Sequence, residues 1–173
     1  GIRASVRDLR TTEKQVLIEE TRKRVNRMLR YGVTTIEAKS GYGLSTESEI
    51  KQLEVIREVG EQVAIDLIPT FLGAHEVPDE YREKRGEYVD LIINEMIPAV
   101  VSAGLAEFSD IFTEKGVFDI EESRRIQQAA KEAGLKLKAL NVDNYYHDLD
   151  SHPRDRSGDH DYETPQAIEL DLF

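Results

Sequence analysis

The feature that most constrains the fold is a regular alternation of helix-like and strand-like segments along residues 12–140. Four segments carry apolar residues at helical spacing, and each is followed by a short run that is β-branched or almost continuously apolar. The helical segments are residues 12–29, 46–60, 89–104 and 119–134, and the strand segments are residues 33–38, 63–72, 108–112 and 135–140. Strands that alternate with helices predict right-handed crossovers and a parallel sheet. We therefore expect an α/β fold with four parallel strands.

The predicted helices carry recognisable start and stop signals. Three of them begin with a capping-box pattern, in which a Ser, Thr or Asp is followed three residues later by Glu or Gln. The pairs are Thr12 with Gln15, Thr46 with Glu49, and Asp119 with Glu122. Glycines follow the predicted helix ends at residues 32, 60, 104 and 134. Pro98 lies inside the third helical pattern and predicts a kink or a break there.

Two arrangements of these units fit the pattern. Four strand–helix units make up half of an eight-stranded (β/α)8 barrel, and they also make a small open sheet. Periodicity alone does not choose between the two. Residues 1–140 form the predicted domain in either case.

The last part of the chain, residues 141–173, differs in character. It holds nine acidic residues and two arginines, so it contributes −7 of the net charge of −11. Helical or strand periodicity is absent from it until a short apolar run at residues 167–173. We expect an acidic extension that is disordered or loosely packed.

Composition excludes several classes of function. A net charge of −11 and a pI of about 4.9 argue against a nucleic-acid surface and against a polybasic membrane surface. The absence of cysteine excludes a disulfide framework, a thiolate zinc site and a cysteine nucleophile. The chain has no apolar run of membrane-spanning length and no signal-peptide pattern, which predicts a cytoplasmic protein. Because the chain starts with Gly1, we expect a processed, tagged or partial sequence.

Polar residues gather where the predicted strands end, at residues 34–44, 68–78 and 111–118. Parallel α/β enzymes place their chemistry at the carboxyl ends of their strands. His75 follows a Gly-Ala pair there, and it is either a hydrogen-bonded turn residue or an imidazole that polarises a substrate or transfers a proton. Tyr42 stands between two glycines, which let a ligand approach the backbone closely.

Charged residues along the strands have two interpretations. Glu37 and Lys39 would share one face of the first strand, and Asp110, Phe112 and Glu114 one face of the third. Such groups are either catalytic or part of an ion-pair network on the sheet. The network is the commoner arrangement inside a barrel.

The histidines of the acidic extension are weak metal-ligand candidates. His147, His152 and His160 lie among aspartates, but the spacing lacks the glycine and terminal glutamate of a calcium loop. Zinc ligands need rigid elements and hydrogen-bond partners that orient them, which this stretch does not supply. A new metal site made by the extension is the least favoured alternative.

Two motifs carry a resemblance to a known family. They are Glu-Ala-Lys-Ser-Gly-Tyr-Gly-Leu at residues 37–44 and Thr-Phe-Leu-Gly-Ala-His-Glu-Val-Pro at residues 70–78. With them, about residues 1–138 resemble imidazolonepropionase, a member of the amidohydrolase superfamily. The resemblance implies part, about half, of a metal-dependent (β/α)8 barrel. It also implies a small-molecule substrate, 4-imidazolone-5-propanoate, hydrolysed to N-formimino-glutamate in histidine degradation.

The resemblance assigns roles to two residues and leaves others unfilled. Tyr42 and His75 match the substrate-binding tyrosine and histidine of the family. The family uses one zinc or iron ion, but Leu140 stands where a metal histidine is expected, and Val142 or Asp143 where its carboxylate is expected. We therefore assign no catalytic residue and no metal ligand, and expect this chain to be inactive by itself.

From Ala139 onward the family pattern is lost, which suggests a truncation, a frameshift or an engineered junction. The alternative function is a non-catalytic α/β scaffold or binding module. Such a module would form homo-oligomers through open sheet edges.

Overall fold

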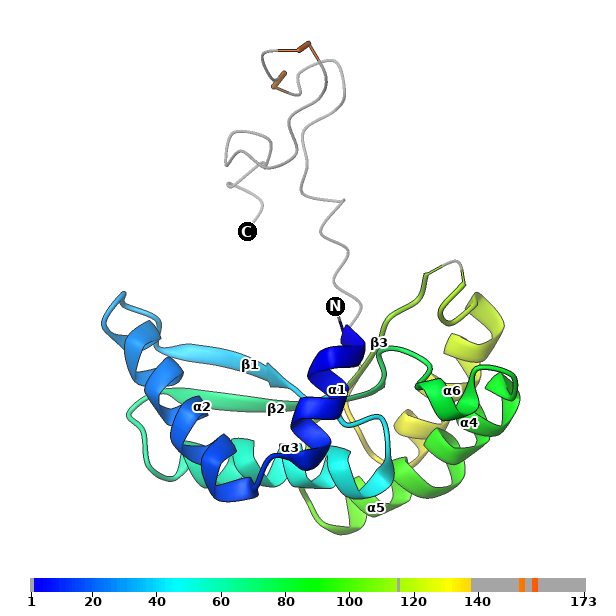
Figure 1. Ribbon diagram of the computed structural model, residues 1–173, viewed down its shortest axis with the longest axis horizontal. Coiled ribbons are helices and arrows are strands. Elements are labelled where there is room, and N and C mark those ends of the chain that lie inside the picture. Colours follow the sequence, from blue (N-terminus) through cyan, green and yellow to red (C-terminus); the bar gives the residue numbers. More distant parts are fainter. Residues whose placement is uncertain (1, 115, 138–152, 155–156, 159–173) are drawn as a thin grey trace. The chain divides into compact units, whose positions relative to one another are not determined.

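A computed structural model describes residues 2–114, 116–137, 153–154 and 157–158 of the chain (Figure 1). The chain divides into two units, residues 1–137 and residues 138–173. Every helix and strand of the described residues lies in the first unit. The predicted character of the extension lies largely outside the described residues and stays a prediction.

The described residues confirm an α/β fold in which helices and strands alternate. The elements, in chain order, are α1 (Ile2–Thr11), α2 (Lys14–Leu29), β1 (Thr35–Lys39), α3 (Thr46–Gly60), β2 (Asp66–Ala74), the 3₁₀ turn η1 (Asp79–Tyr81), α4 (Arg85–Leu91), the π turn η2 (Ile92–Met96), α5 (Ile97–Ser102), β3 (Phe108–Ile111) and α6 (Ile120–Glu132). Figure 1 shows α3 and α5 together below the sheet in this view.

The sheet of the described residues has three parallel strands in the order β1-β2-β3. Lys39 of β1 pairs with Thr70 of β2, and Thr70 pairs in turn with Phe108 of β3. The fourth strand predicted at residues 135–140 is not seen in the described part of the chain, which ends there at residue 137. Lys136 instead forms one parallel bridge to Phe108. Its amide donates a hydrogen bond of 2.9 Å to the Glu107 carbonyl, and its carbonyl accepts one of 3.1 Å from the Ser109 amide.

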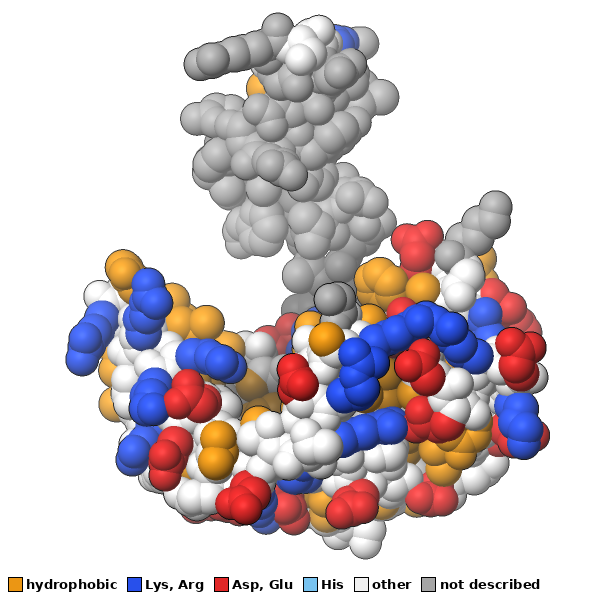
Figure 2. Space-filling model, viewed as in Figure 1, with side chains coloured by type: hydrophobic (Ala, Val, Ile, Leu, Met, Phe, Trp, Pro, Cys, Tyr) orange, Lys and Arg blue, Asp and Glu red, His pale blue; other side chains and the backbone are white. Residues whose placement is uncertain are grey.

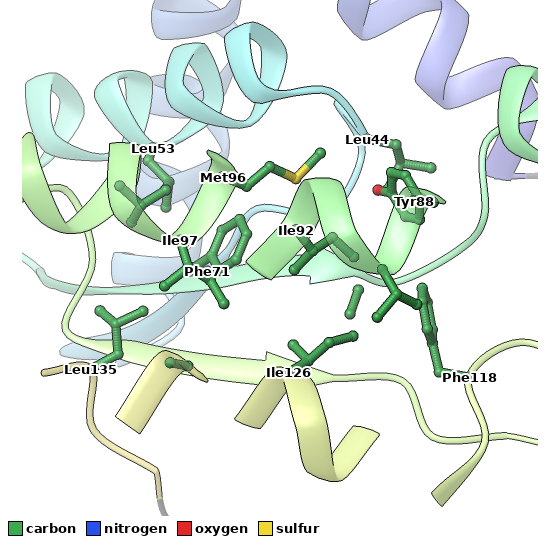
Figure 3. Packing of buried hydrophobic residues seen from close by; sticks show 14 of the residues in the cluster. Leu44, Leu53, Phe71, Tyr88, Ile92, Met96, Ile97, Phe118, Ile126 and Leu135 are labelled. Atoms are coloured by element: carbon green, nitrogen blue, oxygen red, sulfur yellow. The ribbon is translucent and has the colours of Figure 1, made fainter. Parts of the chain in front are cut away.

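The helical side of the sheet carries the hydrophobic core. Phe71 of β2 is 1% exposed and packs among the apolar side chains of α3, η2, α5 and α6 (Figure 3). The other large members are Leu44, Leu53, Tyr88, Ile92, Met96, Ile97, Phe118, Ile126 and Leu135. Each such side chain contributes about 1.5–3 kcal/mol when it is fully buried. A smaller cluster joins α2 to α3 through Ile18, Val25, Val55, Val59 and Ile65. These two clusters fix the helices to one face of the strands.

The capping boxes predicted from the sequence have different outcomes. Asp119 and Glu122 form one at the start of α6, with both reciprocal hydrogen bonds present. The box predicted at Thr12 is wrong, because α2 begins at Lys14 after Glu13, whose side chain makes no cap hydrogen bond. At α3 the cap is Ser45, which accepts a hydrogen bond from the Ser48 amide, and Thr46 is already helical. Helix α1 carries no predicted signal and is found only in the structure.

The break expected at Pro98 takes the form of a π turn. Residues 92–96 are π-helical and lead directly into α5, where Pro98 stands in the first turn. Proline cannot donate the hydrogen bond that an α-helix needs at this position, and a π turn shifts the bonding by one residue. The helical segment therefore continues through the proline. Ile92, Met96 and Ile97 stay buried against the sheet.

Candidate functional site

The residues that follow the three strands form a cluster of rings. Tyr42 comes after β1, His75 directly follows β2, and Phe112 directly follows β3. The Tyr42 and His75 rings meet edge to face with centroids 5.0 Å apart, and His75 meets Phe112 in the same way at 6.0 Å. Tyr42 is 39% exposed and Phe112 is 48% exposed. The carboxyl ends of the strands thus carry an accessible aromatic site around one imidazole.

One hydrogen bond defines the state of the His75 ring. The Nδ1 atom of His75 lies 2.8 Å from the carbonyl oxygen of Gly41. A carbonyl can only accept, so Nδ1 carries the proton in this contact. Nε2 is then the nitrogen left for a ligand. It accepts a hydrogen bond when the ring is neutral and donates one when the ring is protonated.

Two glycines allow the close approach that this hydrogen bond needs. Gly41 has a φ of +100°, and a Cβ atom there would lie 2.7 Å from the Leu72 carbonyl oxygen and 3.1 Å from the His75 Cβ. A Cβ at Gly43 would lie 2.5 Å from the backbone of Ser48. Side chains at either position would push the 41–44 loop away from β2 and α3. The Gly-Tyr-Gly sequence is therefore a packing requirement of this loop.

The face of the sheet opposite the helices carries an ion-pair network. Lys39 Nζ lies 2.6 Å from the Asp110 carboxylate and 3.5 Å from that of Glu37, while Thr70 donates a hydrogen bond of 2.9 Å to Glu37. Partial burial lowers the pKa of Lys39, but the hydrogen bond and charge of Asp110, with the charge of Glu37, outweigh it and leave that pKa raised. Of the two interpretations of these charges, the structure places Glu37, Lys39 and Asp110 in the network.

A cavity of about 380 Å³ adjoins Tyr42 and Lys39. It lies among α1, α2, α3 and β1, and its lining includes Arg24 and Gln52 together with apolar side chains. Gln52 also accepts a hydrogen bond of 3.1 Å from the Tyr42 backbone amide. The Tyr42 region thus has free volume beside it and a fixed backbone.

A zinc or iron ion needs a cluster of ligating side chains. Among the described residues, no group of three or more His, Cys, Asp or Glu side chains could hold a metal. The positions where the resemblance places metal ligands, Leu140, Val142 and Asp143, lie outside the described residues. The same holds for His147, His152 and His160. The described residues therefore do not fit such an ion.

Three residues of the site have roles that the sequence patterns did not predict. Glu49 was predicted to cap a helix, yet its carboxylate binds the backbone of the 41–44 loop. Arg10 binds carbonyls of the same loop from α1, and Phe112 was predicted only as a strand-face residue. The capping-box pattern marked Glu49 as a residue with a local hydrogen-bonding role. No sequence signal pointed to Arg10.

The surface agrees with a chain of mixed charge. In Figure 2, Lys and Arg side chains alternate with Asp and Glu side chains over the helices in view. None of the helices in the described part of the chain has the length and apolar character needed to cross a bilayer. The predictions about nucleic acid, membrane surfaces and a cytoplasmic location rest on the sequence and stay predictions.

Fold and site together define a parallel α/β protein with a candidate small-molecule site at the carboxyl ends of its strands. No family model matches the chain. It is 52% identical over 143 residues to imidazolonepropionase from Alkaliphilus metalliredigens, covering 83% of this chain and 34% of that protein. The imidazolonepropionase of Geobacillus kaustophilus is 47% identical over 147 residues, covering 84% and 35%. That of Clostridium tetani is 48% identical over 138 residues, covering 80% and 33%.

These comparisons confirm the resemblance. Over about four fifths of its length the chain is homologous to imidazolonepropionases. The aligned lengths of 138 to 147 residues, 80–84% of the chain, are consistent with a partial match. The chain spans about a third of the length of the curated relatives it matches.

Proposed function

We propose that this chain supplies one wall of the substrate pocket of an imidazolonepropionase, with Tyr42 and His75 as its substrate contacts. The proposal rests on one observation: the two motif residues, far apart in the sequence, meet with ring centroids 5.0 Å apart at the strand ends. In the proposed assembly the three strands are part of a (β/α)8 barrel. The ion-paired face of the sheet would then face the barrel interior, where inward side chains form layers.

The chemistry expected of the two residues follows from their geometry. A cyclic amide substrate such as 4-imidazolone-5-propanoate presents ring N–H and C=O groups. The neutral His75 ring offers Nε2 as an acceptor to an N–H, and the protonated ring offers it as a donor to a carbonyl. Tyr42 offers a flat ring against which a planar substrate stacks, and a hydroxyl that donates or accepts.

Hydrolysis in this family is proposed to need a zinc or iron ion, which supplies an activated water when bound. At the sequence position expected for a metal histidine this chain carries Leu140. We therefore propose that the chain by itself binds substrate-like molecules and does not open the ring. A ring-opening assay with added zinc or iron checks this, and metal-dependent turnover by the purified chain would contradict it.

Ligand titration tests the pocket itself. We expect N-formimino-glutamate or imidazole-4-propanoate to shift the ring resonances of His75 and Tyr42 in NMR spectra. Each of the variants Tyr42→Phe and His75→Gln should weaken binding by about tenfold, which corresponds to about 1.4 kcal/mol for one lost hydrogen bond. The matched control is Tyr31→Phe, whose side chain is 77% exposed beyond the end of α2. Equal binding by all four proteins would refute the proposed contacts.

A second function is favoured by the open sheet. In the described residues β1 and β3 are the outer strands of the sheet. The outer side of β3 is partly bonded by Lys136, so β1 is the more open edge, and an open edge can pair with another chain. A self-associating α/β scaffold would use the open edge without catalysis. Gel filtration separates the two proposals, because the scaffold predicts a concentration-dependent dimer that ligand does not alter.

A further inference from the structure

The 41–44 loop is held from one side by a buried carboxylate. Glu49 of α3 has no exposed surface, and both of its oxygens accept hydrogen bonds from backbone amides. Gly41 donates to Oε2 at 2.9 Å, while Gly43 and Leu44 donate to Oε1 at 2.8 Å each. Burying a carboxylate is costly unless such donors replace its water. The fold therefore uses a charged side chain to fix this one turn of backbone.

The carbonyl side of the same loop is held by a cation. Arg10 of α1 donates from Nε to the Gly43 carbonyl at 2.7 Å and from Nη2 to the Leu44 carbonyl at 3.0 Å. Its Nη2 also lies 2.8 Å from the Glu80 carboxylate. Lys51 of α3 binds three carbonyls at the end of α1, which anchors the helix that carries Arg10. Two oppositely charged side chains, Arg10 of α1 and Glu49 of α3, thus bind the backbone of the loop.

These contacts are connected to the imidazole through the carbonyl of Gly41. The amide of Gly41 is bound by Glu49, and the carbonyl of the same residue receives the proton of His75 Nδ1. Tyr42 lies between the two anchored glycines, and its own amide binds Gln52 one turn further along α3. Any shift of the Glu49 carboxylate therefore moves the acceptor that orients His75, together with the backbone that carries Tyr42.

We infer that Glu49 is a positioning residue for the site, acting with Arg10 to hold the Gly41 carbonyl where it keeps His75 in the Nδ1–H form. The inference rests on the proposed function, because only a site that uses His75 and Tyr42 needs them oriented. The effect of Glu49 on the His75 ring does not depend on a substrate. In the neutral ring, the hydrogen bond from Nδ1 leaves Nε2 unprotonated and available to a ligand.

The test is the tautomer of His75 in the Glu49→Gln variant of the full chain. Glutamine keeps the shape of the side chain but turns a donor toward a backbone amide that needs an acceptor. ¹⁵N-detected NMR at a pH where the ring is neutral reports the ratio of the Nδ1–H to the Nε2–H form, and His75→Gln identifies the signal. We expect the ratio to fall by about tenfold, the factor of a net hydrogen bond of about 1.4 kcal/mol.

Controls separate positioning from a general loss of structure. Glu47→Gln changes an exposed carboxylate two residues earlier in α3 and should leave the ratio unchanged. Arg10→Met loosens the loop from its other side and should lower the ratio too. It also serves as the deciding variant if the glutamine protein does not fold. A folded Glu49→Gln or Arg10→Met protein with the wild-type ratio would overturn the inference.

The outcome is distinguishable from failure of the proposed function. If the wild-type chain binds neither N-formimino-glutamate nor imidazole-4-propanoate while the tautomer ratio still falls in the variants, the pocket proposal fails and the positioning of His75 stands. If ligands bind and the ratio does not move, the pocket stands and the role of Glu49 is refuted.

Discussion

At the scale of single residues, two backbone positions favour glycine over every other residue, and one of them, Gly41, lies in the site. Gly41 and Gly32 both have left-handed backbone, with φ of +100° and +87°. A Cβ atom at Gly32 would have no other atom within 4 Å, whereas Gly41 packs against Leu72 and His75. The same substitution therefore tests strain alone at one position, and strain plus contact at the other.

We expect Gly32→Ala to lower the free energy of unfolding by about 1 kcal/mol, the cost of a left-handed alanine. Gly41→Ala should cost a similar amount for its left-handed backbone, and more for the contact with the Leu72 carbonyl. It should also remove the hydrogen bond from His75. Chemical denaturation measures both costs, and an equal loss in the two variants would show that the close packing of Gly41 contributes nothing.

At the scale of elements, helix termini connect parts of the chain that are distant in sequence. Asp119 and Glu122 form the capping box of α6, and Glu122 also pairs with Arg85 at the start of α4. The two hydrogen bonds from Arg85 measure 3.0 and 2.7 Å and form a bidentate contact. The Glu122 side chain therefore both caps the start of α6 and binds α6 to α4, which carries the buried Tyr88.

Tyr88 connects α4 to β2, the strand that His75 directly follows. Its hydroxyl donates a hydrogen bond of 2.8 Å to the Gly73 carbonyl, at the irregular part of β2. Burial, and secondarily the charge of Glu49, raise the pKa of Tyr88 well above its ordinary value. The neutral hydroxyl is thus retained as the donor that holds the end of β2.

Loss of the α6 cap should be measurable by itself. Asp119→Ala removes the acceptor for the Glu122 amide and should lower the free energy of unfolding by about 1 kcal/mol. Glu121→Ala is the matched control, since Glu121 lies in the same turn and, among the described residues, pairs with Arg124 at the surface. A cost at residue 121 as large as that at residue 119 would mean that charge near the helix start, and not capping, is responsible.

At the scale of the whole molecule, a charge pair joins the outer strands of the described sheet. Lys39 of β1 and Asp110 of β3 are in contact although 71 residues separate them. The pair spans β2, so it restrains the three strands as a unit. Both side chains are about two-fifths exposed, and solvent screening limits what such a pair contributes.

We expect Lys39→Met to lower stability by about 0.5–1 kcal/mol near neutral pH, the upper part of the range for exposed pairs. Folding raises the pKa of Lys39, so its contribution is fully present below 10.5, the value for the unfolded chain, and is lost as the pH rises through the folded value. Wild type and variant should therefore converge in strongly alkaline buffer and in high salt. A difference that persists there would indicate lost packing of the lysine side chain.

Sequence patterns settled those features that depend on neighbouring residues. The alternation of periods predicted the parallel α/β fold, and the Asp119–Glu122 spacing predicted a real capping box, because such hydrogen bonds close within one helical turn. The motifs around Tyr42 and His75 identified the family to which the comparisons point.

Tertiary structure decided what depends on contacts between distant segments. Glu49 has the spacing of a capping residue, yet the 41–44 loop folds back over α3 and brings three amides to its carboxylate. The position of α1, the bond between His75 and Gly41, and the pairing of Lys39 with Asp110 likewise form only once the strands are assembled. A side chain binds whichever partner the folded chain brings close to it. Sequence spacing does not contain that information, because it depends on how distant segments pack.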